Sequence, residues 1–296
     1  METYKEFCKP GQTWVEPGQG GLPLLHIHNG YADCEVFLHG AHVARFQPKG
    51  QPDVLWMSPY SVYGEGKPIR GGIPVCFPWF GPHRTRPELP QHGFARLRIW
   101  ELVSIGYLPN GKTQVVLSLD DDEGTLSAWP YHFHAEMRIT VGADLTMALL
   151  VRNTGKEEFS CEEAFHTYFS VSSPLACEIQ GLDGVGYIDR THNDARKTQS
   201  GPLRVTCEMV KAFMGAPVSC QLVDDQASGT RRIKVEQEGM GAMVVWNPWE
   251  AAAQRNPEIL EGWQQYVCIE SANVLDCPIV FLPGDSHLST MRLSYV

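Results

Sequence analysis

An alternation of apolar and polar side chains between residues 133 and 151 restricts the possible folds of this chain more than any other feature. Its apolar members occupy every second position on both sides of Gly142-Ala143-Asp144, and they are Phe133, Ala135, Met137, Ile139, Val141, Leu145, Met147, Leu149 and Val151. Successive side chains of a β-strand point to opposite faces of the sheet. The pattern therefore predicts two antiparallel strands joined by a tight turn.

Similar alternation recurs along most of the sequence. Strands are predicted at residues 32–38, 115–119, 232–236, 242–246, 266–270 and 287–295, whereas only residues 123–129 fit a short helix. Each sheet must bury one face, so we expect an all-β fold, specifically a large antiparallel β-sandwich. The 28 glycines and 21 prolines are spread evenly, without a linker or a repeat, which predicts a single domain over residues 1–296.

Composition excludes several classes of protein. Acidic residues outnumber basic ones by 34 to 24, and the formal net charge of −10 argues against nucleic acid as the main partner, although a small anion could bind a local basic site. The nine cysteines form no CxxC pair, so neither a disulfide framework nor a thiolate zinc site is indicated. No apolar segment has the length of a signal peptide or a membrane span. We expect a cytoplasmic monomer with no membrane partner.

Two segments could present arginine to an anion. The first, Ile69-Arg70-Gly71-Gly72-Ile73-Pro74-Val75-Cys76-Phe77-Pro78-Trp79-Phe80-Gly81, combines glycines that permit close backbone approach with prolines that restrict the chain. The second, Gln91-His92-Gly93-Phe94-Ala95-Arg96, contains an amide, an imidazole and a second guanidinium. A guanidinium suits a carboxylate or a phosphate. The alternative is that Arg70 pairs with a structural acid and that Arg96 lies in a surface loop.

His166 and Glu270 are candidates for proton transfer. His166 lies between aromatic residues in Ala164-Phe165-His166-Thr167-Tyr168, and imidazole is well suited to proton transfer near neutral pH. Glu270 ends the apolar strand predicted at 266–270, where an unpaired carboxylate is costly to bury. Structural roles in the core remain the alternative for both residues.

Metal and nucleotide sites find little support. The pairs His26/His28 and His132/His134 each place two imidazoles on one strand face, but no further ligand follows at a familiar spacing, so we predict no metal site. The motifs GxSxG and GxGxxG are absent from the sequence. Serine hydrolases and dinucleotide enzymes are therefore not indicated, and we also predict no P-loop enzyme.

Taken in order, five segments resemble the hexose-6-phosphate mutarotases, also called glucose-6-phosphate 1-epimerases, of the aldose 1-epimerase superfamily. They are residues 69–81, residues 91–96, Phe165-His166-Thr167-Tyr168-Phe169, Trp246-Asn247-Pro248-Trp249 and Val267-Cys268-Ile269-Glu270. The resemblance spans about residues 25–285. It implies a galactose mutarotase-like β-sandwich and cofactor-free interconversion of the α and β anomers of a hexose 6-phosphate, most simply glucose 6-phosphate.

The same resemblance implies individual roles. His166 matches the general acid, Glu270 matches the general base, and His92 matches a histidine that lines the sugar site. The sugar-phosphate contacts are matched by Arg70, Gln91 and Arg96. No metal or organic cofactor is implied, and the expected partner is a small-molecule sugar phosphate.

One position departs from the family pattern. Val210 stands where the family usually has a substrate-binding aspartate, and Glu208, two residues earlier, is the candidate to replace it because alternation would put both on one strand face. Two other functions stay open: a non-catalytic sugar-phosphate-binding protein, and a mutarotase for unphosphorylated aldoses. The presence of both His166 and Glu270 favours the enzyme, and Arg70 with Arg96 favours a phosphorylated substrate.

Overall fold

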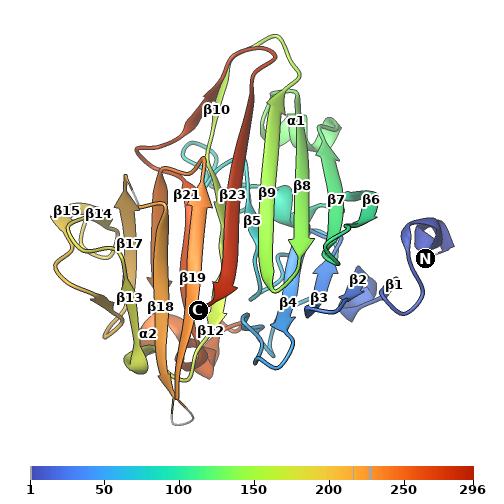
Figure 1. Ribbon diagram of the computed structural model, residues 1–296. Coiled ribbons are helices and arrows are strands. Elements are labelled where there is room, and N and C mark those ends of the chain that lie inside the picture. The colour runs from blue at the N-terminus through green and yellow to red at the C-terminus, as the bar shows by residue number, and fades with distance from the viewer. Residues whose placement is uncertain (1, 216, 227–228) are drawn as a thin grey trace.

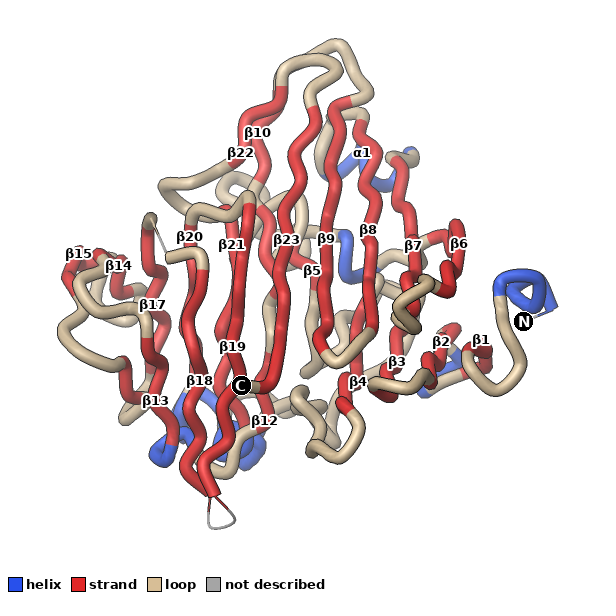
Figure 2. The backbone as a smooth tube through the Cα atoms, viewed as in Figure 1, coloured by secondary structure: helices blue, strands red, loops and turns tan. Residues whose placement is uncertain are grey.

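Two large antiparallel sheets dominate the computed structural model, which describes residues 2–215, 217–226 and 229–296. Figure 1 shows the long strands of one sheet side by side, and Figure 2 shows how little of the chain is helical. Apolar side chains from both sheets, among them Ile139 and Leu293 from one and Val245 and Ile269 from the other, belong to one continuous core. The predicted all-β sandwich is confirmed.

The nine-stranded sheet has the order β16-β13-β18-β19-β23-β9-β8-β7-β6. Its strands are β6 (Glu101–Tyr107), β7 (Thr113–Asp120), β8 (Phe133–Val141), β9 (Asp144–Asn153), β13 (Cys177–Gln180), β16 (Leu203–Arg204), β18 (Ser219–Gln226), β19 (Gly229–Glu238) and β23 (Ser286–Tyr295). Strands β8 and β9 form the predicted hairpin, with Val141 opposite Leu145 next to the turn.

The eight-stranded sheet has the order β15-β14-β17-β20-β21-β11-β5, and β12 also pairs with β21. Its strands are β5 (Val75–Cys76), β11 (Glu163–Phe165), β12 (Tyr168–Ser170), β14 (Gly186–Asp189), β15 (Ala195–Thr198), β17 (Met209–Met214), β20 (Ala242–Asn247) and β21 (Tyr266–Asn273). This sheet carries both candidate proton-transfer residues, because Glu270 lies within β21 and His166 directly follows β11.

Smaller elements complete the fold. A four-stranded sheet contains β1 (Thr13–Pro17), β2 (Pro23–His28), β3 (Ala32–Phe37) and β4 (His42–Pro48), and β10 (Phe159–Cys161) pairs with β22 (Ile279–Phe281). The helices are α1 (Glu123–Ala128), α2 (Trp249–Ala253) and the 3₁₀ helices η1 (Glu2–Phe7), η2 (Gln19–Gly21), η3 (Ala95–Leu97), η4 (Pro174–Ala176) and η5 (Leu260–Gln265). Within the described ranges, no helix is both long and apolar enough to pass through a lipid bilayer.

The sequence predictions located the long strands well. Each of the eight predicted strands is present, as β3, β7, β8, β9, β19, β20, β21 and β23, and the predicted short helix is α1, where the Asp122 side chain accepts from the Thr125 backbone N–H. The short strands β5, β11, β12, β14, β15 and β17 of the eight-stranded sheet were not predicted. All of these except β17 have two to four residues, and strands of that length are too short to show a clear period-two pattern.

Candidate functional site

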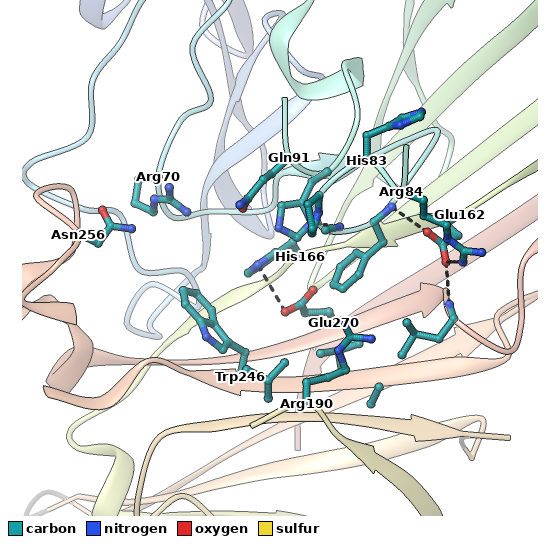
Figure 3. Close-up of a pocket in the computed structure, with 18 residues that line it drawn as sticks. Arg70, His83, Arg84, Gln91, Glu162, His166, Arg190, Trp246, Asn256 and Glu270 are labelled. Atoms are coloured by element: carbon teal, nitrogen blue, oxygen red, sulfur yellow. Dashed lines mark hydrogen bonds and ion pairs between the residues drawn. The ribbon is translucent and has the colours of Figure 1, made fainter. Parts of the chain in front are cut away.

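A cavity of about 700 Å³ opens on the eight-stranded sheet, and it contains most of the predicted site residues. Figure 3 shows the His166 and Glu270 side chains at its centre, facing each other. Its lining residues are Arg70, Phe80, Gly81, Pro82, His83, Arg84, Gln91, His92, Glu162, His166, Arg190, Val210, Ala212, Val244, Trp246, Asn256, Glu270 and Leu275. A volume of this size suits a small-molecule ligand.

Antiparallel pairing of short segments with β21 brings His166 and Glu270 together across 104 residues of sequence. Strand β11 ends at Phe165, which pairs with Ser271, so that His166 emerges next to Glu270. His166 Nε2 lies 3.4 Å from Glu270 Oε1. The imidazole stacks on the Tyr168 ring at a centroid distance of 4.9 Å and meets the edge of Trp246 at 5.5 Å. Aromatic packing therefore fixes the orientation of the imidazole.

Burial shifts the protonation of this pair in opposite directions. Both side chains are almost completely shielded from water, and this desolvation lowers the pKa of His166 to about 3 and raises the pKa of Glu270 well above its ordinary value. His166 Nδ1 and Glu270 Oε2 have no hydrogen-bond partner among the described residues. Unpaired buried polar atoms are costly, so both groups are candidates to meet a ligand.

Arg70 lines the cavity, but its guanidinium already has protein partners. Its Nη1 donates to the Tyr168 hydroxyl at 3.1 Å, and its Nη2 donates to Glu258 Oε2 at 3.2 Å. The interaction with Tyr168 is the main reason that the pKa of Arg70 is raised, and Glu258 adds to it. Gly72 has a φ of +60°, and a Cβ there would overlap the Val43 carbonyl oxygen, so glycine is required for the turn after Arg70.

Gln91 and His92 reach the cavity from the second predicted segment. His92 adopts a left-handed φ of +62°, and its Nδ1 accepts from the Gly81 backbone N–H at 3.2 Å. Its ring lies 5.7 Å from that of His166, and burial lowers the pKa of His92 well below its ordinary value. Gly93 follows with a φ of +73°, where any Cβ would collide with the Phe77 carbonyl, so this loop packs directly against the first segment.

Two predicted contact residues do not line the cavity. Arg96 is only 8% exposed, and its Nη2 donates to the Gln91 carbonyl at 2.7 Å, so its side chain supports the loop instead of facing the open cavity. Glu208 is exposed and precedes β17, which begins at Met209, so the alternation that would align it with Val210 does not extend to it. Val210 does line the cavity, as the resemblance implied for that position.

Sequence analysis missed two further cations, Arg84 and Arg190. Arg84 comes from the loop after β5, and Arg190 comes directly after β14, so they are far apart in the sequence and only the fold brings both to one cavity. Figure 3 shows Arg84 with Glu162 on the far side of Glu270 from Arg70 and Asn256. Neither arginine stands in a segment with a recognisable motif. The described residues contain no group of three or more His, Cys, Asp or Glu side chains arranged to hold a metal ion.

Comparison with known proteins gives the family of this chain. The family model described as Aldose 1-epimerase matches residues 23–294. The chain belongs to the aldose 1-epimerase family. A relative from Cenchrus ciliaris named "Putative glucose-6-phosphate 1-epimerase" is 32% identical over 287 residues, covering 93% of this chain and 85% of that protein. A relative of the same name from Escherichia coli is 29% identical over 269 residues, covering 90% of this chain and 89% of its own.

Solved structures of other proteins have the same fold as this member of the aldose 1-epimerase family. A Salmonella typhimurium protein described as "a putative mutarotase" superposes with a TM-score of 0.86 at 24% identity, covering 96% of this chain and 94% of that chain. The galactose 1-epimerase of Lactobacillus acidophilus superposes with a TM-score of 0.73 at 13% identity, covering 96% and 98%. The galactose mutarotase-like fold that the resemblance implied is therefore confirmed.

Proposed function

We propose that the protein is a cofactor-free mutarotase that interconverts the α and β anomers of a hexose 6-phosphate, most simply glucose 6-phosphate. The observation that carries this proposal is the His166–Glu270 pair, 3.4 Å apart and buried at the centre of a cavity lined by arginines. Membership of the aldose 1-epimerase family supports the reaction type. The names of the Cenchrus ciliaris and Escherichia coli relatives support the phosphorylated substrate.

The reaction needs one proton removed and one delivered. In ring opening, Glu270 takes the proton of the C1 hydroxyl while His166 gives a proton to the ring oxygen, and the bond from C1 to the ring oxygen breaks to leave an aldehyde. The C1–C2 bond then rotates. Reclosure on the other face returns both protons along the same route, so the enzyme ends in its starting state and no oxidant, reductant or metal is required.

The environment of the pair favours one side of this proton balance. Ring opening starts from a Glu270 carboxylate and a His166 imidazolium, the form that burial disfavours. It leaves Glu270 protonated and His166 neutral, the form that burial favours, since burial raises the pKa of Glu270 and lowers that of His166. The ring-opened state is therefore stabilised relative to the same reaction in water, where a carboxylate and an imidazolium would both be well solvated. A positioned acid or base typically contributes ~10²- to 10⁴-fold to the rate.

Gln91, His92 and Arg70 are the proposed contacts for the sugar, because each lines the cavity beside the pair. Trp246 forms an aromatic wall next to His166. Arg96 supports the Gln91 backbone in this proposal, and its cation lies near enough to the pair to help lower the pKa of His166.

Saturation-transfer NMR tests the proposal directly. Magnetisation exchange between the α and β anomers of glucose 6-phosphate is measured with and without the protein, and glucose is measured in parallel. We expect much faster exchange of the phosphorylated sugar. Binding without faster exchange would establish the alternative of a sugar-phosphate-binding protein, and equal acceleration of both sugars would establish a mutarotase for unphosphorylated aldoses.

A further inference from the structure

Tyr168 takes no part in the proposed reaction steps, although it belongs to residues 165–169, the segment that supplies His166. It is 1% exposed and does not line the cavity, so it does not meet the substrate itself. It nevertheless contacts two residues that do line the cavity, His166 through its ring and Arg70 through its hydroxyl. One side chain therefore touches both the proposed acid and a proposed contact for the sugar phosphate.

Backbone hydrogen bonds fix where Tyr168 lies. Its N–H donates to the Gly72 carbonyl at 2.9 Å, and its carbonyl accepts the Trp56 N–H at 2.9 Å. It also pairs with Cys268 where β12 meets β21. Gly72 comes two residues after Arg70, so the backbone of Tyr168 is joined directly to the loop that presents this arginine.

Aromatic packing holds the Tyr168 ring in one orientation. Its centroid lies 5.0 Å from that of Tyr266 and 5.9 Å from those of Trp56 and Trp246. The His166 imidazole lies against the ring with an interplanar angle of 11°. Closely packed rings cannot turn without displacing their neighbours, so the Tyr168 ring restrains the imidazole. Proton transfer depends on such a restraint, because the reacting atoms must be held close together and in line.

The Tyr168 hydroxyl serves a different neighbour. It accepts Arg70 Nη1 at 3.1 Å, while Glu258 Oε2 accepts Nη2 of the same guanidinium at 3.2 Å. Burial raises the pKa of the Tyr168 hydroxyl, so this group stays uncharged at neutral pH and anchors Arg70 without cancelling its positive charge. Two anchors from different segments thus set the plane of the guanidinium. A guanidinium that is already held in one plane loses less entropy when it binds a phosphate or a sugar hydroxyl.

We propose that Tyr168 is a positioning residue with two separate tasks: its ring orients His166 for proton transfer, and its hydroxyl orients Arg70 for substrate binding. This inference rests on the proposed function for the roles of His166 and Arg70. The two tasks use different atoms of one side chain. Substitutions can therefore separate an effect on kcat, through the ring, from an effect on KM, through the hydroxyl.

The test is Tyr168→Phe, which keeps the ring and removes the hydroxyl. We expect the KM for glucose 6-phosphate to rise roughly 3- to 10-fold, because Arg70 loses one of its two hydrogen-bond acceptors, while kcat stays within about twofold of the wild-type value. In an Arg70→Gln background the same substitution should raise KM no further, because no guanidinium is left to orient. Saturation-transfer NMR at several substrate concentrations gives both constants.

Tyr168→Leu removes the ring as well as the hydroxyl. Its kcat should fall by roughly 10- to 100-fold, since an imidazole that is free to turn is misplaced for proton transfer, and its KM should rise as in Tyr168→Phe. Circular dichroism establishes whether the variant folds. If it does not fold, Tyr168→Phe decides the proposal, because a fall in kcat with the ring intact contradicts it as directly as an unchanged KM.

The matched control is Tyr266→Phe. Tyr266 is completely buried in the same aromatic cluster, but its hydroxyl has no hydrogen-bond partner among the described residues. This variant should keep the wild-type KM and kcat. The proposal is overturned if Tyr266→Phe raises KM as much as Tyr168→Phe does, if Tyr168→Phe leaves KM unchanged or lowers kcat as much as it raises KM, if Tyr168→Phe raises KM equally in the Arg70→Gln background, or if folded Tyr168→Leu keeps the wild-type kcat.

Failure of the proposed function has a different signature. It would appear as absent anomer exchange in the wild type, which would also remove the task assigned to the Tyr168 ring. The task of the hydroxyl would still be tested, because titration followed with ³¹P NMR measures the Kd for glucose 6-phosphate. Tyr168→Phe should raise this Kd by the same factor as KM, and an unchanged Kd would remove the second task as well.

Discussion

Strands β8 and β21 differ in what lies on their two faces. Residues of β8 alternate between buried and more exposed positions, with Arg138 46% exposed between Met137 and Ile139, which are completely buried. All eight residues of β21 are buried. One face of β8 meets water, whereas β21 has the sandwich core on one face and the cavity and its surrounding aromatic residues on the other.

The two strands therefore place their polar side chains in different environments, and this difference matters for function. On β8 they face the solvent and contribute solubility. On β21 they are enclosed, so Glu270 is placed where its protonation is strongly perturbed by burial. A strand that is buried on both faces can therefore support a reactive carboxyl that a half-exposed strand could not.

Removing the reactive groups at β21 should have the largest effect. Glu270→Gln and His166→Asn keep side-chain size but lose proton transfer, so each should lower kcat by ~10²- to 10⁴-fold. The double variant should be little worse than either single variant, because both groups act in the same step. Saturation-transfer NMR on glucose 6-phosphate measures the rates, and circular dichroism establishes that the variants fold.

Glu163 provides a matched control for these variants. It is equally buried but contacts Asn273 and Ser289 on the side away from the cavity. Glu163→Gln should keep wild-type kcat. Near-normal exchange by folded Glu270→Gln or His166→Asn would refute the acid–base assignment.

The next effect concerns the core face of β21. Ile269 is completely buried in the core, so Ile269→Ala should lower the free energy of unfolding by ~2–5 kcal/mol through lost contacts and a cavity. Urea denaturation gives this value. A loss below about 1 kcal/mol would mean that β21 is not packed on its core face as described.

The pH dependence of stability distinguishes the contribution of His166 from that of Glu270. The unfolded chain protonates histidine below about pH 6.5, whereas the pKa of His166 in the folded protein is about 3, so this residue makes stability fall as the pH falls from about 6.5 to about 3. Glu270 has the opposite effect on stability. Its raised pKa keeps a proton on the folded protein above about pH 4.5, where the unfolded chain loses that proton, so this residue makes stability fall as the pH rises.

Denaturation series at pH 5, 6 and 7 can therefore distinguish them. His166→Asn should flatten the fall in stability on acidification, by up to about 1.4 kcal/mol per pH unit. Glu270→Gln should make the fall steeper. Identical slopes in wild type and both variants would contradict the protonation states assigned to the pair.

The smallest effect belongs to the exposed face of β8. Arg138 Nε donates to Glu136 Oε1 at 2.6 Å, and both side chains face solvent in part. Exposed ion pairs contribute little, so Arg138→Ala should change the free energy of unfolding by less than about 1 kcal/mol. A loss as large as that of Ile269→Ala would remove the distinction between the two strands.

Prediction from sequence succeeded where the pattern was local and long. The hairpin of β8 and β9 follows from alternation alone, and β8 has the predicted bounds. The family resemblance located the cavity residues Arg70, Gln91, His92, His166 and Glu270. It did not reveal that Arg96 is buried under the Gln91 loop or that Glu208 lies outside β17, since both outcomes depend on how the loops pack.

The sequence by itself determined the strand-rich character, the hairpin and the presence of an acid and a base, because side-chain periodicity and residue chemistry are properties of the chain. Tertiary structure alone decided that β21 is buried on both faces and that His166 lies 3.4 Å from Glu270. It also brought Arg84 and Arg190 to the same cavity. The physical reason is that strands distant in sequence pair through backbone hydrogen bonds, which every residue except proline can both donate and accept. This pairing sets which side chains meet and how much water reaches them.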